Sequence, residues 1–108
     1  MLPRRNTAVF FALLITILTF TLINGCTPDT RYLREGHRYA DAGDWDKAVT
    51  FFQKANEDNP GDTEISLMLR RSKFKASQMH LARGRVYLQQ GLFTEAMKEF
   101  QISMALNP

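Results

Sequence analysis

The sequence predicts an all-α protein made of antiparallel helix pairs. Three observations support this prediction. The chain matches itself when shifted by 48 positions, apolar residues between positions 63 and 90 recur at helical spacing, and glycines or an Asn-Pro-Gly turn separate the expected helices. With 108 residues, 44% of them hydrophobic, the chain has room for one small domain and is too short for a large catalytic fold such as a TIM barrel.

The N-terminal segment, 1–25, has the composition of a secretory signal. Arg4 and Arg5 precede residues 8–23, an uncharged apolar run in which Thr is the only polar residue type. At about 1.5 Å per residue the run spans about 24 Å, less than the roughly 30 Å hydrocarbon core of a bilayer, which favours a cleaved signal over a permanent transmembrane helix. Removing the segment takes away both arginines and no acidic residue, so the net charge falls from +3 to +1. The basic pI is therefore poor evidence for nucleic-acid binding.

The signal-like segment is followed directly by Cys26. Because Cys26 is the single cysteine of the sequence, no internal disulfide or cysteine-cluster zinc site is expected. The sequence around it resembles the lipobox of bacterial lipoproteins, with Ile23 three residues before Cys26 and Gly25 immediately before it. The resemblance implies a signal peptide at 1–25, acyl chains such as palmitate at Cys26, and a short tether at 26–30. By the same resemblance, Thr27 stands where inner-membrane lipoproteins often carry Asp. This favours the periplasmic face of the outer membrane, with the inner membrane as the alternative.

The strongest internal signal is a duplication. Shifting the chain by 48 positions aligns residues 29–60 with residues 77–108 and gives nine identities over 32 positions. Chance gives about two at ordinary residue frequencies. Self-similarity at a fixed spacing is typical of helical-repeat proteins. The identical pairs are Leu33 and Leu81, Gly36 and Gly84, Tyr39 and Tyr87, Gly43 and Gly91, Ala48 and Ala96, Phe52 and Phe100, Gln53 and Gln101, Asn59 and Asn107, and Pro60 and Pro108.

The repeated pattern Gly-x2-Tyr, Gly, Ala-x3-Phe, Pro resembles the tetratricopeptide repeat, a helix-turn-helix unit. The resemblance implies a first repeat at 31–62, with helices at about 30–42 and 45–57, and a second repeat that ends in a helix at about 93–106. Gly43 and Gly91 are expected to end the first helix of each pair, and Asp44 to cap the helix that follows it.

The same pattern indicates how the helices of each pair approach one another. Gly36 and Gly84 lie inside a helix, where glycine costs about 1 kcal/mol relative to alanine. That cost is tolerable if the missing side chain lets the second helix come close, with Ala48 and Ala96 facing it. We expect the aromatic residues of the pattern to form core rather than a ligand cage. These residues are Tyr39, Phe52, Tyr87 and Phe100.

Tandem tetratricopeptide copies lie about 34 positions apart, and these copies lie 48 apart, so about 14 positions are extra. The stretch 63–76 contains no Pro or Gly, which predicts one helix from residue 63 to about residue 90, roughly 42 Å long. Residues 63–108 then form a long helix that continues into the second repeat. A break near Ser72 and Lys73 is the alternative. The apolar stripe comprises Ile65, Met68, Leu69, Ala76 and Met79, with Ser72 on the same face.

Charge is divided along the chain, with a net charge of −4 over residues 29–64 and +5 over residues 65–108. Two interpretations of the basic stretch remain open. It is a contact face for an acidic partner or anionic lipid head groups, or a solvated face that pairs with the acidic first repeat. Only Phe74 interleaves with it as an aromatic, so a nucleic-acid role is not expected. The basic contact face is Arg70, Arg71, Lys73 and Lys75.

No pattern typical of catalysis or of cofactor binding occurs in the sequence, so we expect neither an enzyme nor a cofactor. His37 and His80 lack companions at metal-ligand spacing, so we expect each to be a surface or groove residue and no metal site. The tetratricopeptide resemblance implies instead a concave face for a protein or peptide partner. Its residues are Leu33, His37, Ala40 and Asp41 in the first copy, and Leu81, Arg85, Leu88 and Gln89 in the second.

These features favour a lipid-anchored interaction module of the bacterial envelope. It is similar to the small lipoproteins that help secretin channels of pilus and secretion systems assemble, and to the helical-repeat segment that precedes some secretins. The alternatives are the N-terminal part of a larger envelope protein of this kind and an uncleaved inner-membrane-anchored protein. Repeat arrays normally need about three units and a polar cap. We therefore expect either a homodimer through the last helix or further sequence, because Ile102, Met104 and Leu106 would otherwise stay partly exposed.

Overall fold

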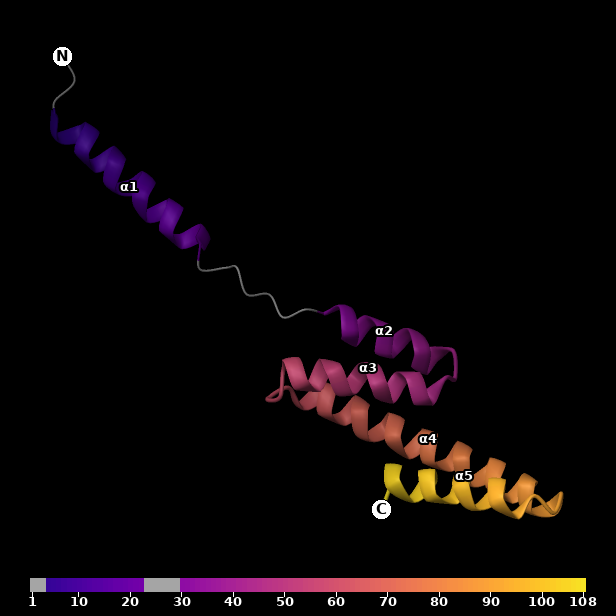
Figure 1. Cartoon of the computed structure of the whole chain (residues 1–108). Coiled ribbons are helices and arrows are strands. Elements are labelled where there is room, and N and C mark those ends of the chain that lie inside the picture. The colour runs from indigo at the N-terminus through magenta and orange to yellow at the C-terminus, as the bar shows by residue number, and fades with distance from the viewer. Residues whose placement is uncertain (1–3, 23–29) are drawn as a thin grey trace.

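The computed structural model describes residues 4–22 and 30–108, and the protein is helical along most of this length (Figure 1). No strand occurs among these residues, which confirms the all-α class. The long helix continues without interruption past Ser72 and Lys73, so the alternative with a break there is wrong. The helices are α1 (Arg4–Leu22), α2 (Arg31–Asp41), α3 (Trp45–Asp58), α4 (Thr63–Gln89) and α5 (Phe93–Leu106).

Helix α1 contains most of the apolar run of the N-terminal segment, and the large apolar side chains described at residues 9–17 are exposed, as at Phe10 and Phe11. In the described parts of the chain, we find no helix that is both long and apolar enough to cross a membrane. Cys26, the expected lipidation site, lies outside the described residues.

Helix α4 packs on one helix hairpin and forms the first helix of a second. Helices α2 and α3 form the first hairpin, and α3 packs along the first part of α4, while α5 packs back along its second part (Figure 1). Two hydrogen bonds show the alignment. The hydroxyl of Ser66 donates to the Asn56 side chain at 2.9 Å, and the hydroxyl of Ser103 donates to the carbonyl of Ser77 at 2.9 Å. Helices α3 and α5 each run antiparallel to the part of α4 that they cover (Figure 1).

The two hairpin turns lie at equivalent positions of the duplication and have the same geometry. Gly43 and Gly91 both have a φ of 76°, in the left-handed region that glycine adopts without steric cost. In each copy the residue after the glycine donates its backbone N–H at 2.9 Å to a tyrosine carbonyl, that of Tyr39 or Tyr87. The expected glycine turns are confirmed, and the duplication extends to hydrogen bonds of the main chain.

The helix caps differ between the copies. The Asp44 carboxylate accepts the backbone N–H of Lys47 at 3.2 Å, as expected for the cap of α3. This hydrogen bond lowers the pKa of Asp44 below its ordinary value. At the start of α4 the Asp62 carboxylate accepts the N–H of Ile65 at 3.1 Å. Leu92 holds the equivalent position before α5 and gives no side-chain cap, so the second hairpin lacks one stabilising contact of the first.

Each hairpin contains a contact between a glycine and a phenylalanine ring. A Cβ atom placed on Gly36 would lie 2.7 Å from Cδ1 of Phe52, and one on Gly84 would lie 2.5 Å from Cε1 of Phe100. Real Cβ atoms do not come so close to a ring, so the helices approach this closely only because both positions are glycine. Phe52 is 1% exposed and Phe100 is half-buried. The first contact is therefore the more enclosed of the two.

The apolar core is concentrated in the first hairpin and the first part of α4. Between α4 and α5 the buried residues are smaller or polar. The expected stripe of α4 faces the core, with Met68 and Met79 half-buried and the other members buried. Tyr39 is half-buried and stacks on Phe51, with ring centroids 5.2 Å apart. The core cluster is Ala48, Phe52 and Leu69, and the buried polar residues are Ser72, Ser77, His80 and Ser103.

Gly36→Ala should destabilise the protein, although alanine is the better helix former. The added methyl group meets the enclosed Phe52 ring, and overpacking of roughly 1–3 kcal/mol opposes the gain of about 1 kcal/mol in helix propensity. Gly84→Ala should cost less, because the half-buried Phe100 has room to shift. Thermal unfolding followed by circular dichroism measures both. The matched control is Gly61→Ala, where a Cβ atom meets nothing within 4 Å. A Gly36→Ala protein that melts no lower than the parent would contradict the packing described.

Candidate functional site

A cavity of about 110 Å³ lies where α2, α3 and α4 meet. It is lined by three of the residues predicted for partner binding, His37, Ala40 and Asp41, all from α2. Arg71 of the basic contact face lines it from α4, a juxtaposition that was not predicted from the sequence. The ring of His37 packs edge-on against Phe52, with centroids 5.2 Å apart. The cavity is smaller than the roughly 300–1,000 Å³ typical of small-molecule sites, so it suits a single side chain of a partner.

The residues predicted from the first copy do not all line this cavity. Leu33 lines a separate cavity of about 80 Å³, together with Asp58 and Asp62, at the other end of the hairpin. Leu33 and Ala40 are both half-buried and pack against the core cluster. Within the first copy, His37 and Asp41 are the two exposed members of the predicted set. A partner would therefore meet mainly their polar groups.

The corresponding residues of the second copy are more exposed. The shift of 48 places Arg85, Leu88 and Gln89 where the first copy has His37, Ala40 and Asp41. All three are exposed, with Leu88 at 48%. Leu81, the fourth predicted residue, is half-buried. The second copy thus presents an open surface at the position where the first copy forms a cavity.

The basic contact face is accessible and lies beside two apolar side chains. Arg70, Arg71 and Lys75 are exposed, whereas Lys73 is half-buried. Leu67 and Phe74, at 51% and 49% exposure, lie on the same side of α4 by helical spacing. Among the described ion pairs none involves the four basic residues of this face. The pairing of these four residues with the acidic first repeat is therefore not seen.

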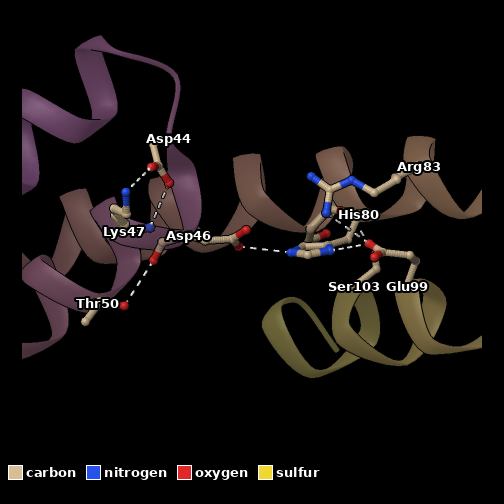
Figure 2. Close-up of polar contacts among 9 residues, drawn as sticks. Asp44, Asp46, Lys47, Thr50, His80, Arg83, Glu99 and Ser103 are labelled. Atoms are coloured by element: carbon tan, nitrogen blue, oxygen red, sulfur yellow. Dashed lines mark hydrogen bonds and ion pairs between the residues drawn. The ribbon is translucent and has the colours of Figure 1, made fainter. Parts of the chain in front are cut away.

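The two hairpins are joined by a polar cluster around the buried His80. The His80 side chain is 6% exposed and lies between Asp46 of α3 and Glu99 of α5 (Figure 2). Its Nε2 is 2.9 Å from the Asp46 carboxylate, and its Nδ1 is 2.5 Å from the Glu99 carboxylate. Arg83 Nη1 lies 3.4 Å from the same Glu99 oxygen. The cluster links three helices through one imidazole.

The two carboxylates favour the protonated form of His80. A neutral imidazole has one N–H donor, and only the imidazolium ion donates from both nitrogens. Burial on its own lowers the pKa of His80, but the hydrogen bonds and negative charges of Glu99 and Asp46 outweigh burial and raise it above its ordinary value. The cluster then combines two positive and two negative groups and is close to neutral.

The duplication shows what this cluster replaces. A shift of 48 places His80 and Glu99 where the first copy has Tyr32 and Phe51, an aromatic pair with ring centroids 6.3 Å apart. The expectation that His80 is a surface or groove residue is wrong. Its partners lie 34 and 19 residues away in the sequence, so no local spacing could reveal them. Comparing the two copies position by position was the signal that could have found the pair.

The described residues give no sign of a metal centre. In residues 4–22 and 30–108, no group of three or more His, Cys, Asp or Glu side chains is placed to hold a metal ion. The Asp46, His80 and Glu99 side chains instead satisfy one another's hydrogen bonds. Their arrangement stabilises the joint between the hairpins.

Comparison with known proteins adds no relative. No protein-family model, curated protein or solved structure matches the chain. Its function is therefore inferred from the residues and contacts described above.

The free energy of unfolding should fall as the pH rises above about 6.5, the ordinary pKa of histidine in an unfolded chain. Because the pKa of His80 is raised in the folded protein, its protonation stabilises the native state below that pH. This stabilisation is lost as the pH rises through the folded pKa. Urea unfolding of a His80→Gln variant should show a loss of ~1–3 kcal/mol near pH 6 and a smaller loss near pH 9.

The control for this experiment is His37→Gln, which removes the other histidine of the chain and leaves the Asp46 and Glu99 contacts intact. It should keep the pH dependence of the parent protein. If the His80→Gln variant also keeps the pH dependence of the parent protein, His80 is not the group that causes it.

Proposed function

We propose that this chain is a lipid-anchored interaction module of the bacterial cell envelope, with two hairpins of tetratricopeptide type facing the periplasm. It binds a protein or peptide partner and helps a multiprotein complex assemble, such as the secretin channel of a secretion or pilus system. The observation that carries the proposal is the cavity where α2, α3 and α4 meet, with exposed His37 and Asp41 beside Arg71.

The stiffness of the scaffold supports this role. The cavity is built on three packed helices, and side chains on helices are held more precisely than side chains on loops. Helix α4 runs from one hairpin into the other, and the Asp46–His80–Glu99 cluster ties both hairpins to it. A partner that contacts both copies would therefore meet surfaces at a fixed spacing.

The N-terminal sequence supports the membrane anchor. Arg4 and Arg5, the apolar run and the Ile23-Asn24-Gly25-Cys26 sequence occur in the order that lipoprotein processing requires. Two or three acyl chains would anchor the protein firmly, at about 0.8 kcal/mol per buried CH₂ group. The exposed Arg70, Arg71 and Lys75 then face either anionic head groups or an acidic partner.

The anchor is tested by metabolic labelling with a radioactive fatty acid. The parent protein should incorporate the label, and a Cys26→Ser variant should lose it, because the thioether forms on the Cys26 sulfur. A Thr27→Ser variant leaves the sulfur in place and serves as the control that keeps the label. Label that survives Cys26→Ser would refute Cys26 as the lipidation site.

The partner-binding face is tested by site-specific photo-cross-linking in living cells. A benzophenone amino acid in place of His37, on the exposed rim of the cavity, should give a discrete cross-linked product with an envelope protein. The same group in place of Thr50, an exposed residue of α3 that does not line the cavity, should not. Identical products from both positions, or none from His37, would contradict a partner at this face.

A further inference from the structure

An apolar face of α5 has no covering element within the described residues. Phe93, Met97 and Met104 are 68%, 61% and 61% exposed. With the half-buried Phe100 they follow a spacing of four, three and four residues, which places them on one side of the helix. Helix α5 lies at the end of the helical array and packs mainly against α4 (Figure 1). An aromatic and thioether stripe of this kind is typical of an interaction surface.

The first copy shows what covers the equivalent face. A shift of 48 places Trp45, Val49, Phe52 and Asn56 of α3 where α5 has its stripe. These residues are buried or half-buried, because the first part of α4 packs on them. The Asn56 side chain even accepts a hydrogen bond from Ser66 of α4 at 2.9 Å. The first part of α4 therefore shows which kind of element covers this face in the first copy. It is an antiparallel amphipathic helix.

The charge beside the stripe differs between the copies. In the first copy the covering helix brings Arg71 to a cavity that it shares with His37 and Asp41. In the second copy the equivalents of those two residues are Arg85 and Gln89, so a carboxylate has been lost and a guanidinium gained. A covering helix with an arginine at this point would meet a like charge. A helix with Asp or Glu there would meet an opposite one.

We infer that the open face of α5 binds an amphipathic α-helix of a partner protein, laid antiparallel to α5, with an apolar stripe over Met97 and Met104 and an acidic side chain opposite Arg85. This inference rests on the proposed interaction function and names the class of partner. A partner helix of this kind is recognised through apolar side chains that lie three and four residues apart in its sequence.

Neither the first part of α4 nor α1 of a second copy fits this description. Residues 63–76 have the right apolar stripe, but they already pack under α3 in the same protomer. Helix α1 contains no acidic residue at all. A second copy would therefore have to unpack its own first hairpin to supply α4 as the covering helix. The exposed Arg85 beside the stripe favours a helix of another protein that carries an acidic residue at this point.

The chain provides a probe for the test. Asn107-Pro108 repeats Asn59-Pro60, so a copy of residues 61–76 added after Pro108 reproduces the native connection to a covering helix. Two full-length proteins are compared, one extended by the native copy and one by a copy carrying Arg71→Glu. The readouts are thermal stability and the rate at which peroxide oxidises Met97 and Met104, with the half-buried Met68 as internal reference.

The extension with Arg71→Glu should raise the melting temperature and slow oxidation of Met97 and Met104 several-fold, while Met68 is unaffected. The native copy should protect them less. An Arg85→Glu change in the body of the protein should reverse this order, since the exposed position 85 would then repel the acidic helix. A Met97→Glu change at an exposed position should weaken the protection by both extensions.

Several results would overturn the inference. Unchanged oxidation with both extensions would show that α5 does not accept a helix, and equal protection by both would refute the acidic contact. Sedimentation that finds the unextended protein already dimeric, with Met97 and Met104 protected, would assign the face to a second copy. If the cross-linker at His37 captures an envelope partner while neither extension protects the methionines, the proposed function stands and this surface does not. Protection without that capture supports the surface and refutes a partner at the cavity of the first hairpin.

Discussion

The structure depends on the continuity of α4. This helix runs from Thr63 to Gln89, so it covers the first hairpin with one part and begins the second hairpin with the other. Because the helix has no break, the two copies share one rigid axis and keep a fixed spacing along it instead of being separate units. The placement of His80 between α3 and α5, the cavity at Arg71 and the open face of α5 all follow from this axis.

The duplicated parts and the altered parts of the two hairpins have different roles. The glycine turns at Gly43 and Gly91 and the glycine contacts with Phe52 and Phe100 are retained in both copies, because they set how closely two helices approach. The positions that differ lie where each hairpin meets its surroundings. The aromatic pair of the first copy becomes the ionisable pair His80 and Glu99 in the second, at the joint with α3. Because the pKa of His80 is raised in the folded protein, this exchange makes the joint sensitive to pH.

Local signals predicted most of the fold. Gly43, Gly91 and the Asn-Pro turns marked the helix ends, the absence of Pro and Gly between 63 and 76 predicted the long helix, and the identities at a spacing of 48 predicted two similar hairpins. The site was predicted less well, because it depends on contacts between residues distant in the sequence. The sequence places Arg71 in the basic contact face, but its position in the cavity beside Asp41 is visible only in the structure. Leu33 and Ala40 were assigned to a partner and pack largely against the core. Spacing within one helix identifies a face of that helix, and only the packing of three helices decides what covers it.

The rigid axis is tested most directly by a distance measured along α4 in solution. Nitroxide labels on Glu64→Cys and Arg85→Cys, in a Cys26→Ser background, occupy exposed positions near the two ends of the helix. Pulsed electron paramagnetic resonance should give one narrow distance distribution centred at ~32 Å, the rise of an uninterrupted helix between these positions at about 1.5 Å per residue. A broad distribution, or a main distance well below this value, would place a hinge in α4 and contradict the shared axis.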